Sequence, residues 1–182
     1  MEEFKIKNNH EQVLSEMQKN IQEVFAMNPE LEKIGSKEDY EKYLETVFPE
    51  SKFKDIVYHG TGTSLFGETG KGFQKKMWDV TYFTKDYQYA NKFAKRSGIN
   101  FGTEGVLYPT VLNITSPIKL ETVASWHIEK VIDKLQSGEN DSVIGTEQGD
   151  DVESIGVYSP EQIHILGSKF DLEKFKEFVE KK

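Results

Sequence analysis

Cysteine is missing from this sequence of 182 residues. Its absence excludes disulfide bonds, thiol nucleophiles and zinc sites with cysteine ligands. The sequence also has no apolar run long enough to cross a membrane, and none follows its Met-Glu-Glu start. We therefore expect a soluble protein of the cytoplasm of the producing or host cell, with no membrane partner. Secretion stays open, because a secreted protein can also lack cysteine.

Basic residues are scarce as well. The 23 Lys and Arg residues are outnumbered by 31 Asp and Glu residues, which gives a net charge of −8. This balance disfavours general attraction to nucleic acid or to an anionic membrane, so a phosphate-bearing ligand needs a local basic patch. The length suits one domain with a helical appendage.

The sequence holds only four histidines, and no two of them have the i, i+4 spacing of helical zinc ligands. We therefore expect no metal site. His164 lies in an alternating Ile-His-Ile run, which predicts a strand position that faces outward. His10 and His127 receive no role, and His59 belongs to the motif described below.

The first fifty residues have the pattern of amphipathic helices. Apolar residues recur at helical spacing over residues 10–27. After an Asn-Pro step, Ser36 and Asp39 have the spacing of a capping box, which predicts a second helix that ends before Pro49. We therefore separate an N-terminal helical segment, residues 1–50, from the rest of the chain.

From Phe53 onward, short runs rich in β-branched and aromatic residues alternate with Gly, Asp, Asn and Ser. This texture predicts an α+β fold for residues 51–182. Helices are expected at residues 86–95, with Asp86 as the N-cap, at 124–136 and at 171–181. Strands are expected at residues 56–58, 80–83, 106–114, 143–144 and 155–158, and long loops at 62–78 and 146–152.

The most informative motif is the His59-Gly60 step at the end of an apolar strand, followed by Tyr82 in a second strand. A glycine lets the main chain approach a ligand closely, a histidine can hydrogen-bond a sugar hydroxyl, and a tyrosine ring can stack. Together they suit a flat amide ligand such as nicotinamide. The alternative is that His59 is an ordinary surface residue and Tyr82 a core aromatic.

Residues 53–168 resemble the ADP-ribosyltransferase superfamily, in the His-Tyr-Glu branch that includes diphtheria toxin and the poly-ADP-ribose polymerases. The resemblance rests on the segments 57–61, 82–84 and 157–163. It is greatest to the transferase domains of phage and mobile-element polyvalent proteins. It implies a split β-sheet core with flanking helices, and a catalytic domain at residues 51–182 that uses NAD as its substrate.

The resemblance also assigns residues to the NAD site. The Gly60 main chain would hold the nicotinamide carboxamide, and the Thr61 side chain would support the turn after it. His59 would contact a ribose hydroxyl, and Tyr82 and Phe93 would enclose the nicotinamide ring. The cofactor-binding set implied by the resemblance is His59, Gly60, Thr61, Tyr82, Ala90 and Phe93.

The third catalytic position leaves two alternatives. Strict register with the family places Ser154 where the family has a glutamate, and Glu153 is next to it. Side chains on a strand alternate between faces, so Glu153 reaches the site only if a β-bulge re-aims it. We favour Glu153 because the flanking glycines permit an irregular strand, which makes the expected catalytic set Glu153, His59 and Tyr82.

The acidic loop before Glu153 is similar to the paired acidic residues of arginine-modifying transferases. By that likeness Asp151, two residues before Glu153, would orient the acceptor, and Gln148 and Glu147 are further candidates. A solvated acidic loop is an alternative of at least equal weight. Basic residues that could meet the NAD diphosphate are Lys75, Lys76, Lys85, Lys92, Lys95 and Arg96. The alternative for most of them is the solvated face of a helix.

The expected function is that of a mono-ADP-ribosyltransferase, which moves ADP-ribose from NAD to a macromolecular acceptor and releases nicotinamide. The acidic balance favours a protein acceptor over nucleic acid. The likeness to phage and mobile-element proteins implies an effector or toxin. Two alternatives stay open: an NAD glycohydrolase, and an inactive module that binds a nucleotide or a protein. The acceptor and the oligomeric state are left undetermined.

Overall fold

The computed structural model describes residues 18–62, 73, 80–123, 130–147 and 152–182. The chain forms two compact units. Unit 1 comprises Met1–Pro49 and Ile165–Lys182, and unit 2 comprises Glu50–His164. The division at residue 50 expected from sequence had grouped residues 165–182 with the sheet, whereas their contacts group them with the N-terminal helices.

Unit 1 is helical. Residues 18–27 form a helix, followed by a short 3-10 helix η1 (Pro29–Lys33), then α2 (Lys37–Val47) and α6 (Lys169–Glu180). The predicted cap is confirmed, because the Asp39 amide donates to the Ser36 hydroxyl at 3.1 Å. α6 begins two residues before the expected start because Ser168 caps it, accepting from the Asp171 amide at 3.2 Å. The part of the first expected helix before residue 18 lies outside the described residues.

Unit 1 contains a buried carboxylate. Asp171 is 0% exposed and accepts hydrogen bonds from the Tyr40 hydroxyl at 2.6 Å, the Tyr43 hydroxyl at 3.1 Å and the Gly167 amide at 2.8 Å. Burial, together with the charge of Asp171, raises the pKa of both tyrosines. The Phe175 ring packs edge-on against Tyr40, at 4.9 Å between centroids. This network joins α6 to α2.

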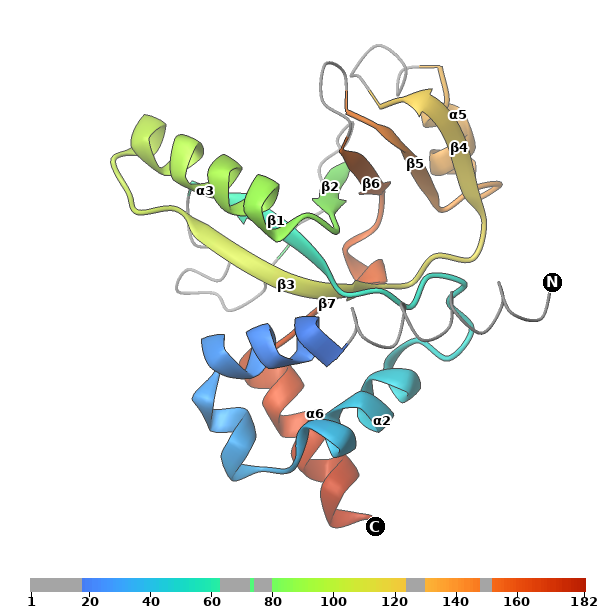
Figure 1. Ribbon diagram of the computed structural model, residues 1–182. Coiled ribbons are helices and arrows are strands. Elements are labelled where there is room, and N and C mark those ends of the chain that lie inside the picture. The colour runs from blue at the N-terminus through green and yellow to red at the C-terminus, as the bar shows by residue number, and fades with distance from the viewer. Residues whose placement is uncertain (1–17, 63–72, 74–79, 124–129, 148–151) are drawn as a thin grey trace, which may run out of the picture. The chain divides into compact units, whose positions relative to one another are not determined.

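Unit 2 contains a seven-stranded open sheet and confirms the α+β class (Figure 1). The strand order is β4-β5-β6-β2-β1-β3-β7. Among the strand pairings described, that of β4 with β5 is parallel and the others are antiparallel. The strands are β1 (Val57–Thr61), β2 (Thr81–Thr84), β3 (Val106–Leu112), β4 (Pro117–Thr122), β5 (Ser142–Thr146), β6 (Glu153–Val157) and β7 (Ile163–Ile165). β4 was not among the expected strands; its apolar residues alternate with polar ones after a leading proline.

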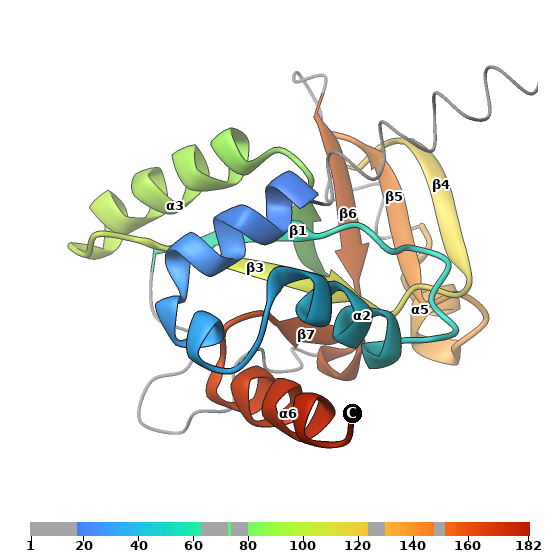
Figure 2. The ribbon, with the colours of Figure 1, turned by 60° about the horizontal axis from the view of Figure 1, so that its bottom comes forward.

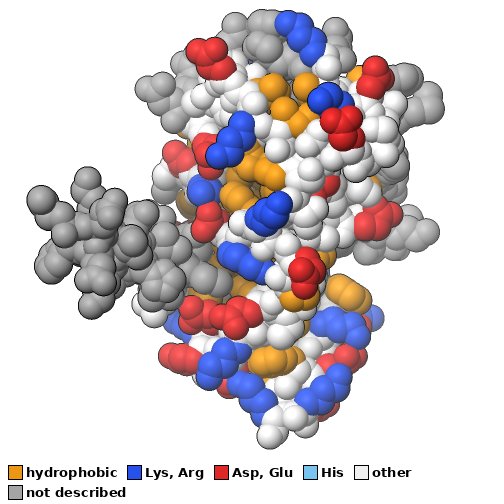
Figure 3. Space-filling model, turned by 90° about the vertical axis from the view of Figure 1, so that its right-hand side faces the viewer, with side chains coloured by type: hydrophobic (Ala, Val, Ile, Leu, Met, Phe, Trp, Pro, Cys, Tyr) orange, Lys and Arg blue, Asp and Glu red, His pale blue; other side chains and the backbone are white. Residues whose placement is uncertain are grey.

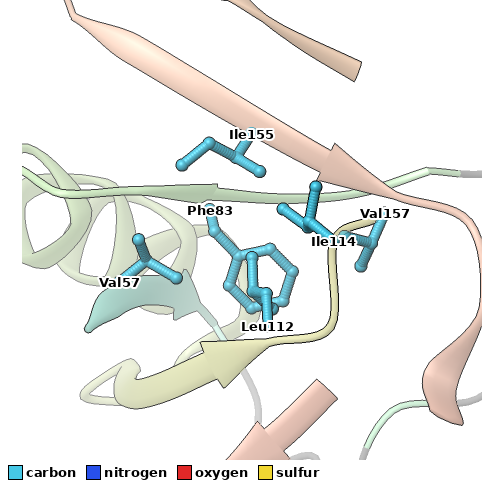
Figure 4. Packing of buried hydrophobic residues seen from close by; sticks show 6 residues of the cluster. All are labelled: Val57, Phe83, Leu112, Ile114, Ile155 and Val157. Atoms are coloured by element: carbon cyan, nitrogen blue, oxygen red, sulfur yellow. The ribbon is translucent and has the colours of Figure 1, made fainter. Parts of the chain in front are cut away.

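The central strands divide their side chains between two faces. One face carries Val57 and contributes to a hydrophobic core whose side chains point toward one another in Figure 4. This core consists of Val57, Phe83, Leu112, Ile114, Ile155 and Val157. We call this side of the sheet the Val57 face. The opposite face carries Tyr58, Tyr82 and Gly156 by register, and we call it the Tyr58 face. A second core lies there, formed by Val80, Val123, Leu135 and Val143.

Two helices of unit 2 accompany the sheet. In Figures 1 and 2, α3 (Tyr87–Phe101) lies alongside β1 and β3. Asp86 caps α3 as predicted, accepting from the Tyr89 amide at 2.9 Å. α3 runs past the expected end at residue 95 because Gly98 packs against the backbone of residues 103–105, which outweighs its low helix propensity. Gly102, with a left-handed φ of 68°, ends it.

The helix expected at residues 124–136 is confirmed from Ile132 onward, as α5 (Ile132–Ser137). Lys130 and Val131 form a turn before it instead of helix, and residues 124–129 lie outside the described residues. Val131, Ile132 and Leu135 pack on the second core, as the spacing predicts. A short 3-10 helix, η2 (Pro160–Gln162), also lies in the described part of unit 2.

The prediction for His164 was wrong. β7 buries His164 to 7% exposure and leaves its isoleucine neighbours partly exposed, so the alternation has the opposite phase. A three-residue strand gives too little pattern to fix that phase.

Charged side chains of both signs are intermixed on the face of the molecule shown in Figure 3. Among the described residues, no helix combines the length and the apolar character needed to cross a bilayer.

Candidate functional site

The sheet is joined only weakly between β1 and β2. β1 pairs with β3 along all of Val57–Thr61, and β2 pairs with β6 along all of Thr81–Thr84. Between β1 and β2, by contrast, the described pairing has a single position, Tyr58 opposite Thr84. The described pairing of β1 with β2 therefore ends before His59. Residues 59–61 of β1 lie beyond it.

His59 contacts β2 beyond the end of this pairing. Its Nδ1 lies 2.8 Å from the Tyr82 carbonyl oxygen. A carbonyl oxygen can only accept, so Nδ1 carries the proton and Nε2 of the neutral ring is an acceptor. Burial lowers the pKa of His59, and the hydrogen bond to the carbonyl opposes that shift. The ring packs against Phe73 and Phe83, at 5.0 and 5.5 Å between centroids.

Gly60 lies on the Tyr58 face, directly under α3. A Cβ atom at this position would overlap the Ala90 carbonyl oxygen and lie 2.9 Å from the Ala94 amide nitrogen. Both alanines are 2% exposed. A glycine is therefore required for helix α3 to approach β1, a structural reason that exists beside the expected contact with a ligand. The same packing places the Ala90 main chain, from the expected binding set, next to Gly60.

Phe93 and Thr61 complete the expected binding set. Phe93 is 53% exposed and follows Ala90 by three residues on α3, a spacing that puts the two side chains on neighbouring positions of the helix surface. Thr61 was expected to support a turn. It is instead the last residue of β1 and pairs with Val106, because the strand runs three residues beyond its predicted end.

Tyr82 and His59 are joined through the Tyr82 main chain, while their side chains leave the sheet on opposite faces. The Tyr82 ring packs on the second core, and its Cε1 would lie 3.3 Å from a Cβ at Gly156. His59 lies with Phe83 on the Val57 face. With this strand register, the His59 and Tyr82 rings do not line a single cleft.

Glu153 also lies on the Val57 face. β6 pairs in unbroken register with β2 from Val157 to Ser154, and with β5 from Val157 to Glu153. The expected bulge is absent from this described stretch, so the prediction of an irregular strand was wrong. Without a bulge, strand alternation turns the Glu153 side chain away from the face of Tyr82.

Lys85 interacts with Glu153. Its Nζ lies 3.6 Å from Glu153 Oε1 and 2.7 Å from Asp55 Oδ2. Burial tends to lower the pKa of Lys85, but the hydrogen bonds and charges of Asp55 and Glu153 outweigh it and raise the pKa. Lys85 is therefore a cation engaged by two carboxylates.

Ser154 occupies the position on the Tyr58 face. It is 4% exposed, and its hydroxyl donates a hydrogen bond to Glu147 Oε2 at 3.1 Å. The Glu147 amide donates to the Val152 carbonyl at 2.9 Å, which closes the hairpin between β5 and β6. Glu147 was expected only as a candidate to orient the acceptor. Counting strand positions back through a tight hairpin from Ser154 is the signal that could have placed it.

Three of the basic residues expected to meet the diphosphate are exposed on α3, namely Lys92, Lys95 and Arg96. Four other expected residues lie outside the described ones, namely Asp151, Gln148, Lys75 and Lys76. Within the described ranges, no three His, Asp or Glu side chains are grouped so that they could hold a metal ion. The described geometry thus has an imidazole acceptor on the Val57 face and, on the Tyr58 face, a glycine under α3 and a carboxylate that accepts a hydrogen bond from a serine. No protein-family model matches this chain, and no curated protein matches it in a sequence search.

Proposed function

We propose that this chain is a mono-ADP-ribosyltransferase that transfers ADP-ribose from NAD to a macromolecular acceptor, with a protein favoured. The observation that carries the proposal is the end of the described β1–β2 pairing before His59. Beyond Tyr58 no further Cα pairing of β1 with β2 is described, and α3 lies against this part of β1. A strand end close to a helix suits a flat ligand that carries a carboxamide.

The described residues offer several contacts to NAD. His59 Nε2 is an acceptor on the Val57 face, so it suits a ribose hydroxyl of a ligand that passes the end of the described β1–β2 pairing. The main chain at Gly60 suits the carboxamide, which both donates and accepts. The half-exposed Phe93 ring offers a stacking surface on α3, and the Tyr82 ring lies on the same face of the sheet as Gly60.

The reaction breaks the bond between ribose C1′ and the pyridinium nitrogen. Its electron pair goes to that nitrogen, so neutral nicotinamide leaves, and C1′ becomes part of an oxocarbenium-like cation. A lone pair of the acceptor then forms the new bond to C1′, and the acceptor loses one proton. A carboxylate near C1′ stabilises the positive charge that develops, and bound aromatic surfaces fix the leaving ring.

A second candidate is an inactive module that binds a nucleotide or a protein. It is favoured by the regular register of β6, which puts Ser154 where the resemblance implies a glutamate. With water as the acceptor, the same site would make the chain an NAD glycohydrolase.

The test is release of nicotinamide from NAD by the full chain, measured by chromatography with and without host-lysate protein, together with NAD binding by calorimetry. We expect release that increases with acceptor. Phe93→Ala is expected to raise KM and Phe93→Tyr to leave it near wild type, since a ring is kept. Binding without release would favour the inactive module, equal release without acceptor would favour the glycohydrolase, and neither binding nor release would overturn the proposal.

A further inference from the structure

Two carboxylates flank the start of β6, and they belong to different faces of the sheet. Glu153 is the first residue of β6 and projects from the Val57 face. Glu147 precedes the hairpin and reaches Ser154 on the Tyr58 face. Only one of them can serve a site on the Tyr58 face, where α3 covers β1.

Glu153 is poorly suited to stabilise a cationic ribose. Its side chain is 50% exposed and lies 3.6 Å from Lys85, whose ammonium also binds Asp55. A neighbouring cation offsets the negative potential that a developing positive charge would feel. Water around the exposed Glu153 carboxylate screens its charge and weakens this potential further.

Glu147 has the opposite surroundings. The described side-chain partner of its carboxylate is the neutral Ser154 hydroxyl, which binds one oxygen, Oε2. Ser154 pairs with Thr84, and Tyr82 is two residues from Thr84 on the same face. Ser154 and Tyr82 are therefore diagonal neighbours, whose Cα atoms lie roughly 7 Å apart in an antiparallel pair. Glu147 reaches the same face from the β5 side of β6.

We propose that Glu147 is the catalytic carboxylate of the transfer reaction and that Ser154 is its positioning residue. This inference rests on the proposed transferase function. As the bond from C1′ to nicotinamide breaks and its electron pair leaves with nicotinamide, Glu147 stabilises the positive charge on the ribose and stays ionised itself. The serine in the register position of the family's glutamate thus retains a role, since it holds a carboxylate supplied by the end of β5.

The test compares matched variants of the full chain, using NAD as the probe and nicotinamide release as the readout. Glu147→Gln keeps the shape of the side chain and removes its charge. We expect its kcat to fall about 100-fold, with KM within about threefold because the binding contacts stay. Glu153→Gln, the matched control, is expected to keep kcat within about threefold, because its charge faces Lys85.

Ser154 gives a second, independent measurement. Ser154→Ala removes the hydrogen bond and should lower kcat roughly tenfold. Ser154→Thr keeps the hydroxyl and should restore most of that loss, which a purely structural role for the small side chain would not predict. Glu147→Asp keeps the charge but shortens its reach, and it is expected to lose kcat while circular dichroism reports an intact fold.

The outcomes separate the two proposals. Wild-type turnover that persists in Glu147→Gln, or disappears only in Glu153→Gln, overturns the role of Glu147 and leaves the transferase intact. Wild-type protein that neither binds NAD nor releases nicotinamide overturns the transferase, and the role of Glu147 with it.

Discussion

Each unit holds a carboxylate that accepts a hydrogen bond from a side-chain hydroxyl, Asp171 in unit 1 and Glu147 in unit 2. Asp171 is fully buried and binds two tyrosine hydroxyls and a main-chain amide. Glu147 is partly exposed and has one described side-chain donor. A carboxylate has a structural role where hydrogen bonds within the protein occupy its oxygens, as in Asp171. A partly exposed carboxylate with fewer such bonds, as in Glu147, can accept a hydrogen bond from a ligand.

The largest expected effect on stability comes from Asp171→Ala. It would leave the Tyr40 and Tyr43 hydroxyls and the Gly167 amide without their acceptor, at a cost of about 3 to 5 kcal/mol in the free energy of unfolding. Urea denaturation followed by circular dichroism measures it. Glu147→Gln, the control from unit 2, should change that free energy by less than about 1 kcal/mol. Equal losses in the two variants would remove the distinction between the carboxylates.

A smaller effect is expected within unit 2 from Gly60→Ala. The new methyl group would meet the backbone of α3 at Ala90, and moving a helix costs about 3 kcal/mol. Gly102→Ala is the matched control, since its Cβ has open space and only its left-handed φ of 68° is strained, at about 1 kcal/mol. A Gly60→Ala protein as stable as Gly102→Ala would show that α3 does not press on β1 as described.

The smallest expected effect is a change in pH dependence at His59. Its pKa is lowered in the folded chain from the ordinary value of 6.5, mainly by burial. As the pH falls below 6.5, the unfolded chain takes up a proton before the folded chain does, so stability decreases until the folded pKa is passed. The side chain at position 59 in His59→Gln does not titrate, so this loss of stability is absent. Denaturation at pH 7.5 and 5.5 should therefore show a smaller decrease for His59→Gln than for wild type, and identical decreases would contradict the burial of the imidazole.

Local features of the fold were predicted well from the sequence. The caps at Ser36 and Asp86 depend on hydrogen bonds between residues three apart, so the residues that make them are visible in a short window. The strands around His59 and Tyr82 were also placed within a few residues, because apolar β-branched and aromatic runs identify them.

Features that depend on distant partners were predicted poorly. The face of Glu153 follows from the pairing of β6 with β2 and β5, and no local pattern showed that the pairing is regular. The length of α3 depends on the packing of Gly98 against the backbone of residues 103–105. Which β7 side chains are buried depends on which side of that strand packs against the rest of the protein. In the candidate site, the sequence identified the strand that carries His59 and Gly60, whereas the face on which Glu153 lies depends on the pairing of β6 with distant strands.

The helix caps and the main strand positions can be read from the sequence, because they follow from residue types and from contacts a few residues apart. The grouping of residues 165–182 with the N-terminal helices, the end of the β1–β2 pairing before His59, and the face that Glu147 shares with Tyr82 depend on contacts between distant segments. The physical reason is that strand register is set between segments far apart in the chain, and a shift of one residue exchanges the two faces.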